Sequence, residues 1–201
     1  MKTLLVSFLL VCISAIGVNA QDELLYEKAA QLKLIYGRWQ KDPNKEKYES
    51  AFFEEFPDDY KTFAIIYGYD DSKNGKPGIL YHNSYDHIIK FFGKITSVVD
   101  TLYYSKIIAI SVDAHWQADA ESFFQDVVRE RTTRDMALVH YILSQYPEEK
   151  ILQFWKFYFD GPHPAKTIDK DLYRYFKRRD ANMCRLIEKA HAFVVEDWEN
   201  H

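Results

Sequence analysis

The sequence predicts an all-α protein, with roughly eight to ten short-to-medium helices in a single compact domain. Apolar residues recur every three or four positions through most of the chain, which is the period of a helix buried on one face. No Asn-Gly or Asp-Gly turn lies between two alternating apolar runs, so the sequence gives no hairpin signal. We therefore expect one helical domain over residues 21–201, long enough to bury a core.

Residues 1–20 have the pattern of a cleaved secretory signal peptide. Lys2 supplies the positive start, an apolar run extends from Leu4 to Val18, and Ala20 offers the small residue before the cut. A run of about 15 residues is short for a spanning helix, which needs about 20. The pattern predicts cleavage after Ala20 and no membrane span in the rest of the chain.

The charge and the cysteine content indicate in which cellular compartment the protein works and which classes of partner are unsuitable. The formal net charge is −4, and only Lys2 among the charged residues lies in the predicted signal. An acidic chain argues against nucleic acid and anionic membranes as general partners. Cys184 is the single cysteine after cleavage, so no internal disulfide forms. We expect a secreted or periplasmic bacterial protein in which Cys184 is a half-buried helical residue; a reactive thiol is the alternative.

The first half of the chain predicts four helices and one loop. An apolar stripe marks a helix from residue 24 to 39, and a shorter helix covers residues 45–56. Pro57 then marks a break, and Asp58 is placed to cap the next helix. Residues 70–78 are the clearest loop, and Asn83 or Ser84 can cap the helix that follows.

The second half predicts helices nearly throughout. The apolar stretch 95–115 has β-branched residues, but its length and the absence of a partner strand favour a helix. Further helices are expected at 117–131, 133–145 with Thr133 as the cap, 148–159, 169–178 and 180–198.

Residues 56–71 and 146–161 align with each other at a spacing of 90. Each segment begins with an aromatic residue, a proline and two acids, and each ends in aromatic residues and an aspartate. The likeness predicts two stacked pseudo-repeats of about 90 residues, as in an α-α solenoid. The alternative is that both segments share only the common features of a helix start. Under either reading, the aromatic run at 154–159 is predicted to be core, with a ligand platform as the alternative.

Two histidine–aspartate pairs are the candidate metal ligands. His115 and Asp119 are four residues apart, as are His82 and Asp86, and on a helix each pair would project from one face. If the pairs met, they could bind Zn²⁺ or Mn²⁺ and activate water. The alternative is that these are capping or surface residues. No cofactor is expected, and a divalent metal is the alternative.

Four further residues are candidates for binding. Asp160 and His163 lie in a loop stiffened by two prolines, Trp116 lies beside His115, and Arg178 belongs to a run of basic and aromatic residues. For the loop the alternative is a simple chain reversal, and for Arg178 a solvated helix face. Trp39, Trp116 and Trp198 would serve a carbohydrate binder if they were exposed.

The sequence favours a non-enzymatic interaction protein over an enzyme. It has no nucleophile elbow, no phosphate-binding glycine loop and no distinguished pair of carboxylates. Helical modules offer broad surfaces for protein partners, so the expected partner is another envelope or secreted protein. The alternatives are a metal-assisted hydrolase using the two histidine–aspartate pairs and a carbohydrate binder using aromatic side chains.

Overall fold

The computed structural model describes residues 22–42, 46–71 and 75–200 and confirms the all-α prediction. The fold is 73% helical and forms one compact domain. The predicted signal peptide lies outside the described residues. Within those residues, no helix is long and apolar enough to cross a membrane.

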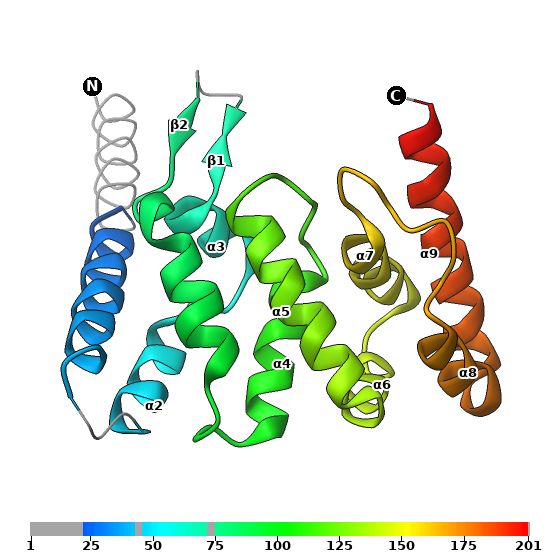
Figure 1. Ribbon diagram of the computed structural model, residues 1–201, viewed down its shortest axis with the longest axis horizontal. Helices are drawn as coiled ribbons and strands as arrows, with labels where there is room; N and C mark the ends of the chain where they lie inside the picture. Colours follow the sequence, from blue (N-terminus) through cyan, green and yellow to red (C-terminus); the bar gives the residue numbers. More distant parts are fainter. Residues whose placement is uncertain (1–21, 43–45, 72–74, 201) are drawn as a thin grey trace, which may run out of the picture.

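The helices follow one another along the long axis of the molecule, from the helix at residues 22–39 to the last helix at the opposite end (Figure 1). The α-helices with labels are α2 (Glu46–Glu55), α3 (Tyr60–Tyr67), α4 (Asp100–Ser111), α5 (Ala120–Arg134), α6 (Met136–Leu143), α7 (Glu148–Phe159), α8 (Lys170–Arg179) and α9 (Ala181–Glu199). Short turns of other helix types are η2 (Tyr81–Asn83), η3 (Asp86–Phe91) and η4 (Phe92–Lys94). Strands β1 (Tyr69–Asp70) and β2 (Lys76–Pro77) pair antiparallel, with Tyr69 opposite Pro77.

Helix α4 lies at the centre and contacts α3, α5, α6 and α7. Its residues are apolar on several sides because neighbours cover it on several sides. This explains why the sequence at 95–115 reads as a continuous apolar run rather than as an amphipathic stripe. The helix occupies only part of that run, because residues 95–99 lead into it without forming helix.

The core consists of two aromatic clusters that meet at α5. In the first, Phe56 stacks on Phe92 with ring centroids 3.8 Å apart. In the second, Trp155 is fully buried and contacts Phe176 at 5.4 Å. Phe124 of α5 belongs to the first cluster and contacts Phe157, at 6.3 Å, on the helix that carries Trp155. The aromatic run at 154–159 is thus core, as predicted.

Buried cations close several helix ends in this core. Lys106 Nζ, from α4, donates to the carbonyls of Phe53 at 2.7 Å and Phe56 at 2.9 Å, at the end of α2. Arg131 Nη2 donates to the carbonyls of Gly93 and Ile95, both at 2.9 Å. These bonds satisfy carbonyls that a helix or turn leaves without an internal partner.

The structure differs from the sequence prediction at three helix starts. Asp59 caps α3, accepting from Thr62 N at 2.8 Å, whereas Asp58 pairs with Lys106. Asp135 rather than Thr133 caps α6. The predicted helix after residue 83 is a π-helix, η3, without a side-chain cap.

The π-helix has a packing consequence at His87. Its wider turn places His87 and Ile88 inward together with Phe91, so that all three are buried. Tyr67 Oη lies 3.1 Å from His87 Nδ1, and within the described part of the chain the other ring nitrogen has no hydrogen-bond partner. Burial lowers the pKa of His87 to about 4, because the charged imidazolium would lose its hydration.

The order of elements recurs along the chain. A helix, a proline, a second helix and a loop occur as α2–α3 and again as α6–α7, with Pro57 and Pro147 in matching places. Their lengths differ, since α3 has 8 residues and α7 has 12. The 90-residue repeat stays a prediction, because a shared order of helices does not by itself require a shared three-dimensional arrangement.

Cys184 lies on α9 and is buried. Burial raises the pKa of its thiol, which disfavours the reactive thiolate. The position supports the structural interpretation of this cysteine over the reactive one.

Candidate functional site

A pocket of about 610 Å³ opens between four segments in the first half of the fold. The helix at 22–39, α3, the β1–β2 hairpin and the loop between α4 and α5 each supply part of its wall. Its lining residues are mostly aromatic or apolar, with a few polar groups: Asp22, Leu25, Tyr26, Tyr60, Ala64, Ile65, Tyr69, Asp70, Lys76, Pro77, Gly78, Ile79, His115 and Gln117. We call this the Tyr60 pocket. A concave, largely apolar site with convergent polar groups is the usual form of a ligand site.

Two glycines let the hairpin form this wall. Gly75 has φ +73°, a conformation that other residues rarely adopt, and a Cβ there would collide with the Tyr69 hydroxyl. Gly78 lies tightly against the end of α3, where its N–H donates to Gly68 O at 2.8 Å. A Cβ at Gly78 would lie 2.8 Å from Ile66 O, so any larger residue would push the hairpin away from α3.

Tyr60 and His115 meet within the pocket. Tyr60 Oη lies 3.2 Å from His115 Nε2 and 3.5 Å from the His115 carbonyl oxygen. Gln117 Nε2 lies 3.4 Å from the same ring nitrogen. Two polar side chains thus converge on one ring nitrogen of His115.

Glu121 lies directly behind Tyr60, in the first turn of α5. It is 1% exposed and forms no ion pair with another described residue, and the Tyr60 hydroxyl is the side-chain group that interacts with its carboxyl. Burial raises the pKa of Glu121 to about 7, because a charged carboxylate is poorly solvated there; the Asp119 carboxylate adds to the rise, whereas hydrogen bonds from the backbone and from Tyr60 oppose it. Burial and the nearby Glu121 carboxyl also raise the pKa of Tyr60. A buried acid without an ion-pair partner is costly in a fold and is typical of functional sites.

The backbone just before Glu121 is strained. Asp119 has φ 63° and ψ −106°, and it is the one non-glycine residue with positive φ among those described. Its carboxylate accepts a hydrogen bond from the Tyr81 hydroxyl, and this bond raises the pKa of Tyr81 to about 12. Strained residues of this kind cost about 1–3 kcal/mol and cluster at functional sites.

The predicted metal ligands are not gathered into one set. His115 and Asp119 lie in the loop between α4 and α5, so the helical spacing assumed for them does not apply. His82 is exposed in η2, and Asp86 forms an ion pair with Lys90 at 2.7 Å. The described part of the chain holds no group of three or more side chains suited to a metal ion. The geometry therefore lends no support to the metal-assisted hydrolase.

Of the other predicted binding residues, Asp160 and Trp116 lie close to each other at the end of α7. Asp160 ends α7, where its carbonyl accepts from Gln125 at 2.8 Å and from Arg129 at 2.9 Å. Burial raises the pKa of its carboxyl, while the backbone N–H groups of Gly161 and Trp116 lower it, so Asp160 and Trp116 are brought together. Asp160 thus serves to hold the loop.

His163 and Arg178 lie nearer the surface. The His163 ring is 6.0 Å from that of Trp198, whose Nε1 donates to Pro162 O at 2.8 Å. Arg178 is exposed in the last turn of α8. No described pocket includes either residue.

The tryptophans named for carbohydrate binding do not form one exposed platform. Trp39 is half-buried and stacks on Phe91, with centroids 4.6 Å apart. Trp116 is half-buried, whereas Trp198 is 44% exposed at the end of α9. A sugar platform would need two such rings exposed side by side.

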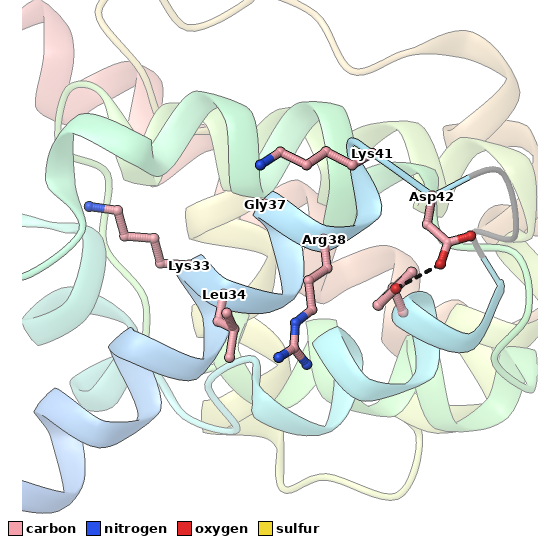
Figure 2. A pocket seen from close by; sticks show the side chains of 7 residues that line it. Lys33, Leu34, Gly37, Arg38, Lys41 and Asp42 are labelled. Carbon is pink, nitrogen blue, oxygen red and sulfur yellow. Dashed lines mark hydrogen bonds between the residues drawn. The ribbon is translucent and has the colours of Figure 1, made fainter.

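A second depression of about 610 Å³ lies along the helix at 22–39 and has a different character. Figure 2 shows that Lys33 and Lys41 point to one side of this helix, whereas Leu34 and Arg38 point to the other. Asp42 accepts a hydrogen bond from Tyr48 at 2.8 Å. Because its side chains diverge, this groove offers no common point at which a ligand would be held.

Comparisons with family models, curated proteins and solved structures gave no match to this chain.

Sequence reasoning missed Tyr60 and Glu121 as site residues. Glu121 shares the buried face of α5 with Phe124, Gln125 and Val128, at helical spacing. A carboxylate on an otherwise inward-facing stripe is the signal that could have found it.

Proposed function

We propose that this protein is an exported, non-enzymatic interaction protein that receives part of another secreted or envelope protein in the Tyr60 pocket. The observation that carries the proposal is the exposed apolar wall of that pocket. Tyr26 is 60% exposed, Ile65 39% and Tyr69 36%, and all three line it. Exposed aromatic and aliphatic side chains around a concavity are typical of interaction sites.

The chemistry of the pocket favours binding over catalysis. Glu121, the group whose pKa is best suited to acid–base work at neutral pH, does not line the pocket and lies behind Tyr60. The His115 ring hydrogen-bonds with Tyr60 and Gln117, and no carboxylate of the described residues hydrogen-bonds to it. A bound molecule would therefore meet hydrogen-bonding and apolar surfaces rather than an aligned nucleophile and base.

Photo-cross-linking in the native cell tests the proposal. A photoreactive phenylalanine analogue replaces Tyr69, and in a second strain it replaces Tyr141 of α6, which is 65% exposed and outside the pocket. We expect one discrete covalent adduct from position 69 and none from position 141. Adding Ile65→Asp should abolish the adduct, because it places a charge in the apolar wall.

Equal labelling from both positions, or no adduct from position 69 in cells that retain the folded protein, would overturn the proposal. Circular dichroism of the purified variants verifies that each one is folded.

A further inference from the structure

We propose that the Tyr60 pocket takes a lysine or arginine side chain of a polypeptide partner, next to an apolar residue of that partner. This inference rests on the proposed function and names the chemistry of the group received. Three features of the pocket support this inference: its acidic side chains, its tyrosine rings, and an aliphatic wall beside its polar groups.

The charged side chains at the pocket are mainly acidic. Asp22 and Asp70 line it, and Lys76, opposite Asp70 in the hairpin, offsets one of the two carboxylates. The whole chain has a formal net charge of −4, so the long-range field has the same sign. The carboxylates at the pocket favour a bound cation over a bound anion. The net negative charge of the chain favours the approach of a cation.

Tyrosine rings add to this preference. Tyr26, Tyr60 and Tyr69 come from three different elements and all line the pocket. The face of an aromatic ring attracts an ammonium or guanidinium group within about 6 Å of its centre. The protein already uses such contacts elsewhere, since Lys106 Nζ lies 4.6 Å from the Phe53 centroid and Arg131 4.3 Å from that of Tyr103.

The remaining wall fits an apolar neighbour of the basic residue. Leu25, Ala64, Ile65 and Ile79 supply aliphatic surface, while Asp22, Leu25 and Tyr26 share one face of their helix at the i, i+3 and i+4 positions. The methylene stem of lysine or arginine also packs on such surface while its head remains solvated.

Polar groups within the pocket can hydrogen-bond with the backbone of a polypeptide partner. With Nε2 of His115 turned toward Tyr60 and Gln117, its Nδ1 is the ring nitrogen left to hydrogen-bond with the partner's backbone. Behind this wall, the buried group that interacts with Tyr60 is the acid Glu121 and not a cation. A site built for an anion would not place an acid there.

Three blocked dipeptides that differ only in charge test the inference: Ac-Phe-Lys-NH₂, Ac-Phe-Gln-NH₂ and Ac-Phe-Glu-NH₂. Each is titrated into the isotopically labelled protein, and binding is followed by the backbone amide shifts of Gly78 and Gln117, which line the pocket. We expect the lysine peptide to bind about tenfold more tightly than the glutamate peptide, with the glutamine peptide between them.

Variants assign this preference to the pocket. Asp22→Asn and Asp70→Asn should each reduce the lysine preference about threefold, since each removes one negative charge. The matched control, Asp171→Asn on α8, removes a carboxylate paired with Arg174 and outside the pocket, and should leave the preference unchanged.

The outcomes separate this inference from the proposed function. Equal binding of all three peptides at the pocket, or tighter binding of the glutamate peptide, overturns the charge inference and supports the pocket as a binding site. No binding by any peptide also overturns it, and cross-linking from position 69 then decides the proposed function alone.

Discussion

At the scale of single residues, Glu121 is the side chain that most needs an explanation. It is buried and forms no ion pair with another described residue, and its neighbour two positions earlier, Asp119, has a strained backbone. Neither residue lines the Tyr60 pocket, but the Glu121 carboxyl interacts with Tyr60, which does. A core glutamine or leucine would pack there at lower cost, which indicates that the acid is kept for the site rather than for the fold.

The Glu121→Gln variant tests the state of this carboxyl. Its folded-state pKa of about 7 lies above the ordinary value of 4.5, so the folded protein binds the extra proton. Its contribution to stability is present below pH 4.5 and declines as the pH rises to about 7. We expect Glu121→Gln to stabilise the protein at pH 8 by about 1–3 kcal/mol and to have little effect at pH 4.5, measured by urea unfolding at both pH values.

The control is Glu54→Gln on α2, at an exposed position, which should be neutral at both pH values. A Glu121→Gln variant that is destabilised at pH 8 would mean that the carboxylate has a partner in solution.

At the scale of elements, side chains from one helix hold the ends of another. Lys106 of α4 is the clearest case, because its ammonium donates to two carbonyls at the end of α2 and pairs with Asp58 at 2.6 Å. Its side chain is 8% exposed, and burial lowers its pKa. One side chain thus joins the central helix to the α2–α3 turn.

Replacing Lys106 with methionine should therefore be costly. Methionine fills a similar volume but leaves the carbonyls of Phe53 and Phe56 without their donor. We expect a loss of about 2–4 kcal/mol in the free energy of unfolding, measured by chemical denaturation. The matched Lys61→Met change, at an exposed position of α3, should cost less than about 0.5 kcal/mol. Similar losses for both variants would contradict this role for Lys106.

The helices were predictable where local signals were strong. Pro147 and the acids after it predicted α7 at residues 148–159, its observed range. The caps at Asp59 and Asp135 were missed because Asp58 and Thr133 are equally good caps locally, and tertiary contacts decide between such neighbours. The hairpin was missed because each of its strands has only two residues, too short for any alternation.

The pocket itself was not predictable from these signals. His115 was chosen for its spacing from Asp119, but its recorded ring partners are Tyr60 and Gln117. Tyr60 is 55 residues away in the chain. Only the packing of α3 against α4, and of the hairpin against α3, brings the four walls together. A sequence pattern reports one element at a time and does not contain such long-range contacts.

At the scale of the whole molecule, two buried groups act on stability in opposite directions. The pKa of His87 is lowered to about 4, so its contribution to stability is lost as the pH falls from about 6.5 to 4. The contribution of Glu121 changes in the other direction between pH 4.5 and 7. The two effects should largely cancel between pH 4.5 and 6.5.

Single variants should reveal how the free energy of unfolding depends on pH through each group separately. In Glu121→Gln, we expect the free energy of unfolding to rise between pH 4.5 and 6.5, because only His87 remains. In His87→Gln, it should fall over the same interval, and in the double variant it should be nearly flat. Urea unfolding at four pH values measures the slopes, and parallel curves for all four proteins would show that neither group titrates as the structure indicates.

Mapping with phenol tests the central claim, that the Tyr60 pocket is the binding site of this molecule. The groove beside Arg38 has the same volume, about 610 Å³, and serves as an internal comparison (Figure 2). Phenol is titrated into the labelled protein, and backbone amide shifts are compared for Gly78 and Gln117 in the pocket and for Gly37 and Lys41 in the groove. We predict saturable shifts at the first pair and none at the second. Shifts confined to the groove, or equal at both places, would contradict the claim.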